Sequence, residues 1–383
     1  MTNGALPFFD LKAQYARLKT EIDAGIHRVL DHGQFILGPE VAEFERALAA
    51  YTGAGHVIGV SNGTDALMLS LLALGVGPGD AVYVPAFTFT ATAEVVLLLG
   101  ATPIFVDVRE DTFNLDTEDL SRAIRATHGL RPRAVVAVDL FGLPADYPRI
   151  SEIAQEYGLQ VIADAAQSLS GAIEGVRVGG LAPLTATSFF PAKPLGCYGD
   201  GGAVFASDGQ MAEKLRSLRA HGTGKAKYDI VHIGMNARLD TLQAAILLVK
   251  LKALEEERGR REALSRYYDA RLSDHVTVPA RPEGYVSAWA QYTLQLDARD
   301  EIQAALGAAG IPTQIYYPCP MHLQPAYAAY GEGKGSLPVS EKVSARVLSL
   351  PMHPYMPEDA AARICDALCE AVAPRRGLMR VGG

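Results

Sequence analysis

The stretch HVIGVSNGTDALMLSLLALGVGPGDAVYVPAF at residues 56–87 decides the fold class. It predicts a short apolar strand at 56–61, a helix at 64–74 and a second apolar strand at 81–87. A strand, a helix and another strand form the repeating unit of a parallel sheet. Both strands are apolar almost throughout, which is typical of strands that are covered by helices on both faces of the sheet.

The same alternation continues along the chain on both sides of this stretch. Further strands are predicted at 103–108, 134–142, 160–166, 185–190 and 201–207, and helices at 90–100, 120–127 and 150–158. The segment before His56 has a helical pattern, with Asp10 as its N-cap. The sequence therefore predicts an α/β protein with a mostly parallel sheet flanked by helices.

A long helical stretch, from about Arg238 to Arg271, follows these units and is expected to connect two parts of the protein. Beyond Ser273, one strand pattern and several helical patterns predict a smaller α+β unit. A chain of 383 residues also exceeds what one hydrophobic core usually organises. We predict a large domain at 1–250 and a small C-terminal domain, with the connecting helix, at 251–383.

Composition excludes several classes of protein. The formal charge of −8 argues against binding nucleic acid or anionic membranes, since both need clustered positive charge. No secretory signal or membrane-spanning run is recognisable, so we expect a cytoplasmic protein. The cysteines have no zinc-site spacing and are too few for a disulfide framework, so we expect reduced thiols and no metal; they lie at 197, 319, 365 and 369.

Three places directly after predicted strands are candidates for chemistry, because ligands of open α/β sheets bind beyond the carboxyl ends of the strands. The first is Ser61-Asn62-Gly63-Thr64-Asp65, between a strand and a helix. Free backbone N–H groups at a helix N-terminus and small hydroxyl side chains suit a phosphate. The alternative is that these residues only cap the helix.

The second and third places carry opposite charges. Asp164 ends the strand at 160–166, where a buried carboxylate needs a cation or strong donors, unless it merely caps a helix. Lys193 lies alone among apolar residues and glycines, in a connection between two strands. A lysine in such surroundings can lose its proton and act as an amine nucleophile towards an aldehyde.

Together, these three features resemble the DegT/DnrJ/StrS-type sugar aminotransferases, which are fold type I enzymes dependent on pyridoxal 5'-phosphate. The resemblance covers nearly the whole chain, from FILGPE at 35–40 to PMHLQPAY at 320–327 and LSLPMHP at 348–354. It implies the fold type I architecture, pyridoxal phosphate as cofactor and transamination as the reaction.

The resemblance also implies roles for single residues around the cofactor ring. Lys193 matches the lysine that forms the internal Schiff base and moves the proton, and Asp164 matches the carboxylate that pairs with the pyridinium nitrogen. Gln167 matches the residue beside the ring hydroxyl. Phe89 matches the aromatic side chain that stacks on the ring, which leaves Phe87 for the core.

Around the phosphate and the subunit interface, the resemblance implies a second set of residues. Gly63, Thr64, the backbone of Asp65 and the hydroxyl of Ser188 match the groups that hold the phosphate. The segment that contains Asn236 and Arg238 resembles one that enters the active site of the neighbouring subunit, with Asn236 at the cofactor. This implies a homodimer with shared active sites.

On the substrate side, the chain most resembles enzymes that act on a UDP-linked 3-keto N-acetyl hexuronate, UDP-2-acetamido-2-deoxy-3-oxo-hexuronate, for surface polysaccharide biosynthesis. Arg238 would face the uronate carboxylate, unless it only forms a salt bridge at a helix N-terminus. Tyr316, Tyr317 and His322 are pocket candidates that could equally pack within the small domain. The expected amino donor is L-glutamate, which leaves as 2-oxoglutarate.

Three alternatives stay open. Related enzymes act on dTDP- or UDP-linked 3-keto or 4-keto deoxyhexoses. Sugar dehydratases of the same family replace the Schiff-base lysine, whereas this sequence retains Lys193. A regulator or sensor that binds the cofactor without turnover is the alternative from another class.

Overall fold

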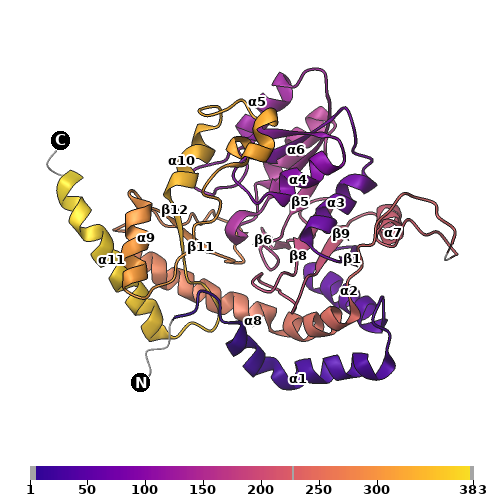
Figure 1. Cartoon of the computed structure of the whole chain (residues 1–383), viewed down its shortest axis with the longest axis horizontal. Coiled ribbons are helices and arrows are strands. Elements are labelled where there is room, and N and C mark those ends of the chain that lie inside the picture. The colour runs from indigo at the N-terminus through magenta and orange to yellow at the C-terminus, as the bar shows by residue number, and fades with distance from the viewer. Residues whose placement is uncertain (1–5, 227, 380–383) are drawn as a thin grey trace.

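The computed structural model describes residues 6–226 and 228–379 (Figure 1). Its helices are α1 (Leu11–His32), α2 (Pro39–Thr52), α3 (Gly63–Ala73), α4 (Ala91–Leu98), α5 (Thr117–Ala126), α6 (Tyr147–Tyr157), α7 (Gly209–Leu218), α8 (Thr241–Leu272), α9 (Arg299–Ala308), α10 (Pro338–Arg346) and α11 (Glu358–Met379). Short 3-10 turns are η1 (Leu140–Gly142), η2 (Met321–Leu323) and η3 (Pro325–Tyr330).

The strands form one large sheet and two small ones. They are β1 (His56–Val60), β2 (Asp80–Pro85), β3 (Thr102–Val106), β4 (Arg131–Val138), β5 (Gln160–Asp164), β6 (Ala172–Ile173), β7 (Val176–Arg177), β8 (Leu184–Ser188), β9 (Gly202–Ala206), β10 (Tyr285–Val286), β11 (Tyr292–Gln295) and β12 (Val347–Leu350). The predicted strands and helices of the large unit are all confirmed, within a few residues at their ends.

The large sheet has seven strands in the order β1-β9-β8-β5-β4-β2-β3. Six strands of this sheet run in the same direction and β9 runs in the opposite one, so the prediction of a mostly parallel sheet is confirmed. The order is not sequential, because β1 and β9 join at one edge while β2 and β3 form the other. The carboxyl ends of the parallel strands therefore gather residues from distant parts of the sequence at one side of the sheet.

Helices cover both faces of this sheet. One face packs against α3, α4 and α7, through a core that includes Leu69, Val95 and Leu215. The opposite face packs against α5 and α6, and α2 and α8 cover it at the edge of β1 and β9. Because both faces are buried, the strands carry apolar side chains on both sides, which explains their nearly unbroken apolar runs.

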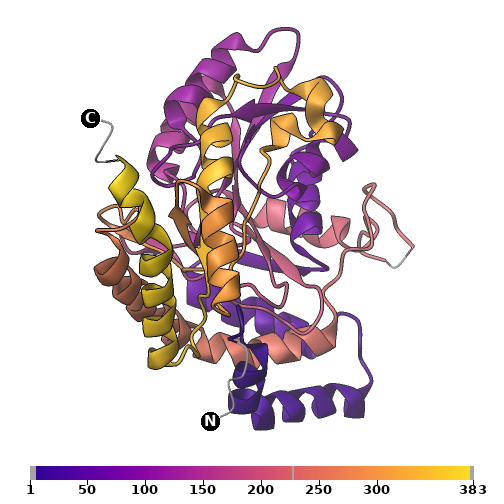
Figure 2. The same ribbon diagram turned by 60° about the vertical axis from the view of Figure 1, so that its left-hand side comes forward.

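Helix α8 runs beneath both parts of the molecule, with α1 packed along it (Figures 1 and 2). Its first half packs on the large unit, and its second half, from Leu264, joins the core of β11, β12, α9 and α11, which we call the small unit. The domain boundary predicted between residues 250 and 251 falls inside this continuous helix. Helix α8 therefore belongs to both units.

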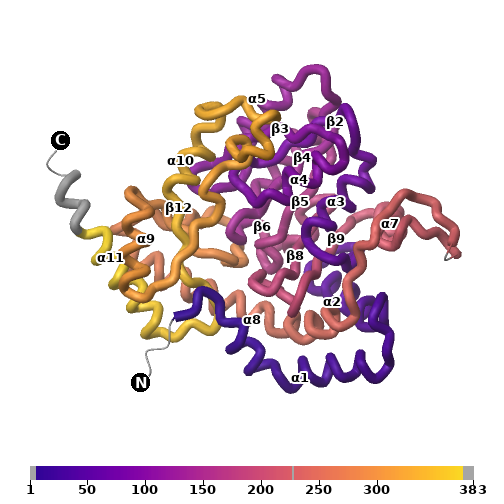
Figure 3. Tube along the Cα trace, viewed as in Figure 1, coloured from indigo at the N-terminus to yellow at the C-terminus, as the bar shows by residue number. Residues whose placement is uncertain are grey.

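Two predicted helix starts can be compared with the structure. Asp10 caps α1 as predicted, since its Oδ1 accepts a hydrogen bond from the Ala13 N–H at 2.8 Å. Helix α8 begins at Thr241, not at Arg238, because Asp240 has an extended backbone and forms an antiparallel bridge with Ile36. The chain before α1 crosses to the small unit, where Leu6 packs against the core (Figure 3).

The cysteines agree with the expectation of reduced thiols: none of the four is bonded to another, and Cys365 packs in the core of the small unit. Among the described residues, no cluster of His, Cys, Asp or Glu could hold a metal ion. No helix within the same residues is long and apolar enough to cross a membrane.

Asp107, just beyond the carboxyl end of β3, ties the large sheet to α10. Its buried carboxylate accepts hydrogen bonds from the Val339 N–H at 3.0 Å, and from the Ser340 N–H and hydroxyl at 2.7 and 2.6 Å. This side chain therefore satisfies backbone donors at the start of a helix more than 230 positions away in the sequence.

We expect Asp107→Ala to lower the free energy of unfolding by about 2–4 kcal/mol, since it removes hydrogen bonds to a charged acceptor and leaves buried N–H groups unpaired. Glu110→Ala is the matched control. It breaks the exposed ion pair with Lys342 between the same two regions, and should cost less than about 1 kcal/mol. Urea denaturation followed by circular dichroism measures both, and equal losses would contradict the role of Asp107.

Candidate functional site

A cavity of about 900 Å³ lies beyond the carboxyl ends of the parallel strands. This volume falls within the range of about 300–1,000 Å³ that small-molecule sites occupy. The predicted site residues that line it are Gly63, Thr64, Asp65, Phe89, Asp164, Gln167, Ser188, Lys193, Tyr316 and Tyr317. Residues from both units thus form its walls.

One wall is the N-terminus of α3, which directly follows β1. Asn62 caps this helix, because its Oδ1 accepts a hydrogen bond from the Asp65 N–H at 2.8 Å. Gly63 and Thr64 are the first two residues after this cap, and their N–H groups have no acceptor within the helix, so they are available to a ligand. The positive end of the helix dipole adds to them, which makes this wall suitable for an anion.

Ser188, at the end of β8, lies against this helix N-terminus. A Cβ atom on Gly63 would lie only 2.7 Å from the Cβ of Ser188, so a glycine is required for the two segments to approach this closely. The predicted phosphate residues Gly63, Thr64 and Ser188 are therefore together in the structure. The Asp65 N–H, in contrast, already donates to Asn62, and the Asp65 carboxylate accepts from the Ser61 hydroxyl.

Asp164 ends β5 in the buried floor of the cavity. Its carboxylate accepts hydrogen bonds from the Thr92 hydroxyl at 2.9 Å and from the Ala166 N–H at 3.3 Å. Burial raises the pKa of the Asp164 carboxyl, while these hydrogen bonds and the nearby Lys193 ammonium act in the opposite direction. A buried carboxylate with two donors can accept a further cationic donor from a ligand.

Lys193 lies on the loop between β8 and β9. The Lys193 N–H donates to the Phe190 carbonyl at 2.8 Å, which closes a tight turn. Burial lowers the pKa of the Lys193 ammonium, and the Asp164 carboxylate partly opposes this effect. A lysine whose pKa is lowered has more of its amine uncharged near neutral pH, and this is the form that attacks a carbonyl group.

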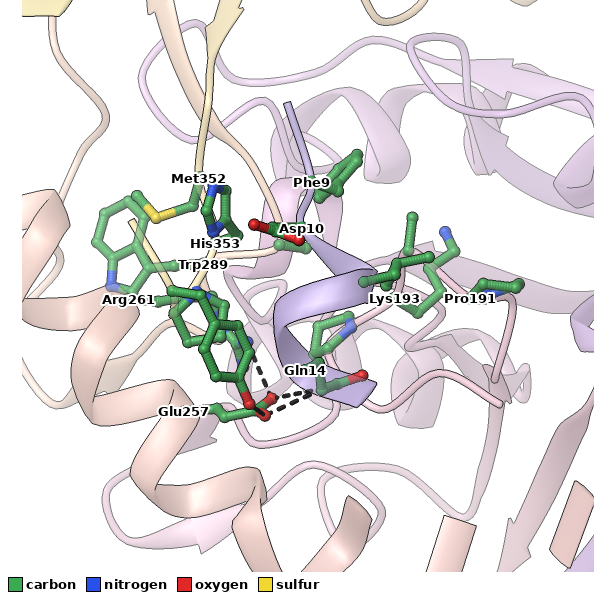
Figure 4. Close-up of a pocket in the computed structure, with 16 residues that line it drawn as sticks. Phe9, Asp10, Gln14, Pro191, Lys193, Glu257, Arg261, Trp289, Met352 and His353 are labelled. Carbon is green, nitrogen blue, oxygen red and sulfur yellow. Dashed lines mark hydrogen bonds and ion pairs between the residues drawn. The ribbon is translucent and has the colours of Figure 1, made fainter. Parts of the chain in front are cut away.

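Behind Lys193 lies a second, much smaller cavity of about 40 Å³ (Figure 4). The Glu257 carboxylate on its wall accepts hydrogen bonds from the Gln14 amide, at 3.0 Å, and from the Tyr355 hydroxyl. Burial lowers the pKa of the neighbouring Arg261 to about 10. These contacts join α1, α8 and the small unit directly behind the loop that carries Lys193.

Gln167 connects the floor of the cavity to the small unit. Its side chain accepts from the Phe141 N–H at 2.6 Å and donates to the Tyr317 hydroxyl at 3.1 Å. Phe89 is 56% exposed within the cavity, whereas Phe87 is fully buried in the core, as expected. An exposed aromatic ring at this position offers a flat surface to a ligand.

Three predicted site residues are not brought into this cavity by the single chain. His322 is buried, and its Nε2 lies 3.2 Å from the Glu341 Oε1, so the alternative of packing within the small unit describes it better than substrate binding. Asn236 is exposed and Arg238 half-buried on the segment before α8, and neither lines the cavity of its own chain.

Several residues at this site are not among those that the sequence predicts. Thr92 donates to Asp164 but does not itself line the cavity, and a hydroxyl in the first turn of the helix after β2 could have indicated it. Gln291, Cys319 and Gln324 come from the small unit and line the cavity. No local pattern marks them, because only the packing of the small unit against the sheet brings them there.

Comparison with known proteins gives the same picture. A family model described as "DegT/DnrJ/EryC1/StrS aminotransferase family" matches residues 16–369. The curated UDP-2-acetamido-2-deoxy-3-oxo-D-glucuronate aminotransferase of Pseudomonas aeruginosa is 48% identical over 364 residues, which cover 95% of this chain and 99% of that protein.

Solved structures agree with this result. A DegT DnrJ EryC1 StrS aminotransferase from Brucella abortus is 51% identical, with a TM-score of 0.94 over 96% of this chain and 99% of that chain. NtdA from Bacillus subtilis, solved with the bound cofactor PMP, is 31% identical, with a TM-score of 0.86 over 93% of this chain and 82% of that chain.

The charge interaction between Asp164 and Lys193 can be tested on the protein without cofactor. Asp164→Asn removes the negative charge that favours the ammonium, so the pKa of Lys193 should fall further and Lys193 should be acylated at lower pH. Mass spectrometry after brief treatment with acetic anhydride at a series of pH values measures this. Asp208→Asn, which alters only the N-cap of α7, should leave the labelling profile unchanged. An identical profile for Asp164→Asn would exclude the interaction.

Proposed function

This chain belongs to the DegT/DnrJ/EryC1/StrS aminotransferase family, and we propose that it transfers an amino group from L-glutamate to UDP-2-acetamido-2-deoxy-3-oxo-glucuronate, at carbon 3. The observation that carries the proposal is the placement of Lys193 and Asp164 in one cavity whose wall is the N-terminus of α3. The similarity to the Pseudomonas aeruginosa enzyme over nearly the full length of both chains supports the substrate.

The residues of the cavity fit pyridoxal phosphate, the cofactor of this enzyme class. The N-terminus of α3 and the Ser188 hydroxyl suit its phosphate, and the close approach of Gly63 and Ser188 puts the two groups side by side. Asp164 suits a protonated pyridine nitrogen, since a buried carboxylate is stabilised by a cationic donor. Phe89 offers its ring to the face of the pyridine. When bound, the cofactor supplies an electron sink for the charge that develops at the substrate carbon.

The chain's own residues hold the cofactor and move the proton. In our proposal, Lys193 binds the cofactor covalently through its uncharged amine, and carries a proton to and from the substrate carbon once that bond is exchanged. Asp164 keeps the proton on the pyridine nitrogen, so that negative charge can be delocalised into the ring. Gln167 and Tyr317 hold the adjoining wall of the cavity by their hydrogen bond.

We propose that the active unit is a homodimer, in which Asn236 and Arg238 of each chain complete the site of the other. Two observations support this. Neither residue lines the cavity of its own chain. The loop that precedes them projects beyond α7 and exposes Ile230, Val231 and Ile233, the last with 87% of its surface accessible (Figures 1 and 2). Neighbouring exposed apolar side chains are typical of a protein interface.

Arg238 supports a uronate as the sugar. The Nε of its guanidinium is buried and makes no hydrogen bond within the described residues. A guanidinium group pairs with a carboxylate through two parallel hydrogen bonds, which a sugar with a methyl or hydroxymethyl group at carbon 6 does not offer. Nucleotide-linked 3-keto or 4-keto deoxyhexoses are therefore the second candidate. We place this reaction in the cytoplasm, where nucleotide sugars and L-glutamate are available.

The reaction can be tested with the purified holoenzyme. We expect a yellow protein that L-glutamate bleaches, and reverse transamination, with 2-oxoglutarate as acceptor, that is fastest with the UDP-linked 3-amino uronate among nucleotide-linked amino sugars. Lys193→Ala should lose the visible absorption, because this residue binds the cofactor. Its rate should fall by more than the factor of about 10² to 10⁴ that a general base alone contributes, because the same residue also moves the proton. A colour that persists with every amino donor would instead favour a sensor without turnover.

Mixing two inactive variants tests the shared active site. A dimer of one Lys193→Ala chain and one Arg238→Ala chain has both defects in one site and none in the other, if Arg238 acts on the partner's site. An equimolar mixture that exchanges subunits should then recover roughly a quarter of the wild-type activity. If Arg238 acts within its own chain, each site of the mixed dimer carries one defect, and no activity returns.

A further inference from the structure

Lys250, in the middle of α8, is a buried lysine to which the chemistry above gives no role. Its side chain is only 2% exposed, and its Nζ donates a hydrogen bond to the Gly196 carbonyl at 2.7 Å. The same ammonium lies 4.0 Å from the centre of the Tyr198 ring. Both partners belong to the loop between β8 and β9, and Gly196 is three residues after Lys193.

The loop between β8 and β9 also forms hydrogen bonds within itself that do not involve Lys250. The Cys197 N–H donates to the Phe189 carbonyl at 2.8 Å, and the Lys193 N–H donates to the Phe190 carbonyl. A Cβ atom on Gly196 would lie 2.4 Å from the Pro191 carbonyl oxygen, so the two arms of the turn touch. A shift of Gly196 therefore displaces the turn that carries Lys193.

A second residue of α8 holds the same loop. Gln243 lies two helical turns before Lys250, on the same face of the helix. Its side chain accepts from the Tyr198 N–H at 2.9 Å and donates to the Tyr198 carbonyl at 3.2 Å. Helix α8 thus forms hydrogen bonds with backbone atoms of both Gly196 and Tyr198 in this loop. The same helix is shared by the two units.

Burying a lysine here is costly, which argues for a specific role. Lysine is almost never fully buried unless it is paired, and Lys250 forms no ion pair within 4.0 Å among the described residues. Desolvation lowers the pKa of Lys250 to about 8, although the negative charge of Glu257 opposes this. An apolar side chain would avoid that cost, but it would leave the Gly196 carbonyl without its donor.

We propose that Lys250 is a positioning residue for the catalytic lysine: its hydrogen bond to Gly196 and its contact with Tyr198 fix the loop of residues 189–199, so that Lys193 stays directed into the large cavity. The proposal rests on the proposed function of Lys193. Lys250 itself touches neither the cofactor site nor the large cavity.

Lys250→Met tests the proposal, because methionine fills a similar volume without charge or donor. We expect kcat to fall by about tenfold to a hundredfold, since a small misplacement of a reacting group has effects of this size. The KM for the sugar nucleotide should change less than about twofold, because no substrate contact is lost. In the holoenzyme, amides of residues 189–199 should exchange hydrogen faster. Lys250→Arg keeps the charge and the donors, so it should restore part of kcat and part of the protection of these amides from exchange.

Lys214→Met is the matched control. Lys214 also donates from Nζ to a backbone carbonyl, that of Ala73 at 2.8 Å, but at the end of α3 and away from the Lys193 loop. It should leave kcat and the exchange of 189–199 unchanged. If Lys250→Met does not fold, Gln243→Leu can replace it, because it removes the hydrogen bonds between α8 and the Tyr198 backbone. This variant should raise the rate of amide hydrogen exchange in residues 189–199 and lower kcat.

The outcomes separate this proposal from the proposed function. If Lys250→Met keeps wild-type kcat and wild-type exchange in residues 189–199 while Lys193→Ala is inactive, the positioning role is wrong and the function stands. If Lys193→Ala remains active, the proposed function is wrong. In that case, exchange in the Lys250→Met and Lys214→Met proteins still decides whether Lys250 holds the loop.

Discussion

The placement of two opposite charges, Asp164 and Lys193, in one cavity is the interaction on which the site depends. Desolvation raises the pKa of Asp164 and lowers that of Lys193, while each charge favours the ionised form of the other. A charged group with little access to water is stabilised by a partner of opposite charge or by hydrogen-bond donors. The two are separated by 29 positions, and the parallel pairing of β5 with β8 brings the ends of their strands together. The sheet order is therefore a condition of the chemistry.

Helix α8 links the sheet around this site to the small unit, because it packs in the cores of both. Its first half packs at the edge of β1 and β9 and against the loop that carries Lys193, and its second half forms part of the small unit. The polar residues along this helix, among them Lys250, Glu257 and Arg261, are buried behind the Lys193 loop. One helix thus connects the position of Lys193 with the small unit that supplies Tyr316 and Tyr317 to the cavity.

In a single chain, the cavity is buried at Asp164 and much more exposed at Phe89. Phe89 remains more than half exposed, and Arg238 lies outside the cavity. Exposed apolar residues near the segment of Asn236 and Arg238 fit the proposal that a second copy completes this side. In this proposal, residues of the partner chain shape the part of the site that distinguishes one sugar from another. They can do so without altering the part that holds the cofactor, which comes from the chain itself.

The sequence by itself determined the α/β alternation and the mostly parallel sheet, because strand and helix periodicity is local. It also predicted that Lys193, Asp164, Gly63 and Thr64 lie at the site, since residues that follow parallel strands meet at one edge of the sheet, whereas Ser188 and the role of each residue came from the family resemblance. The structure places these five residues around one cavity. Only the tertiary structure decided that Thr92 donates to Asp164, that Lys250 holds the Lys193 loop, and that His322 packs against Glu341 and not into the cavity. These contacts join segments whose spacing in the sequence carries no periodic signal, and packing alone brings them together.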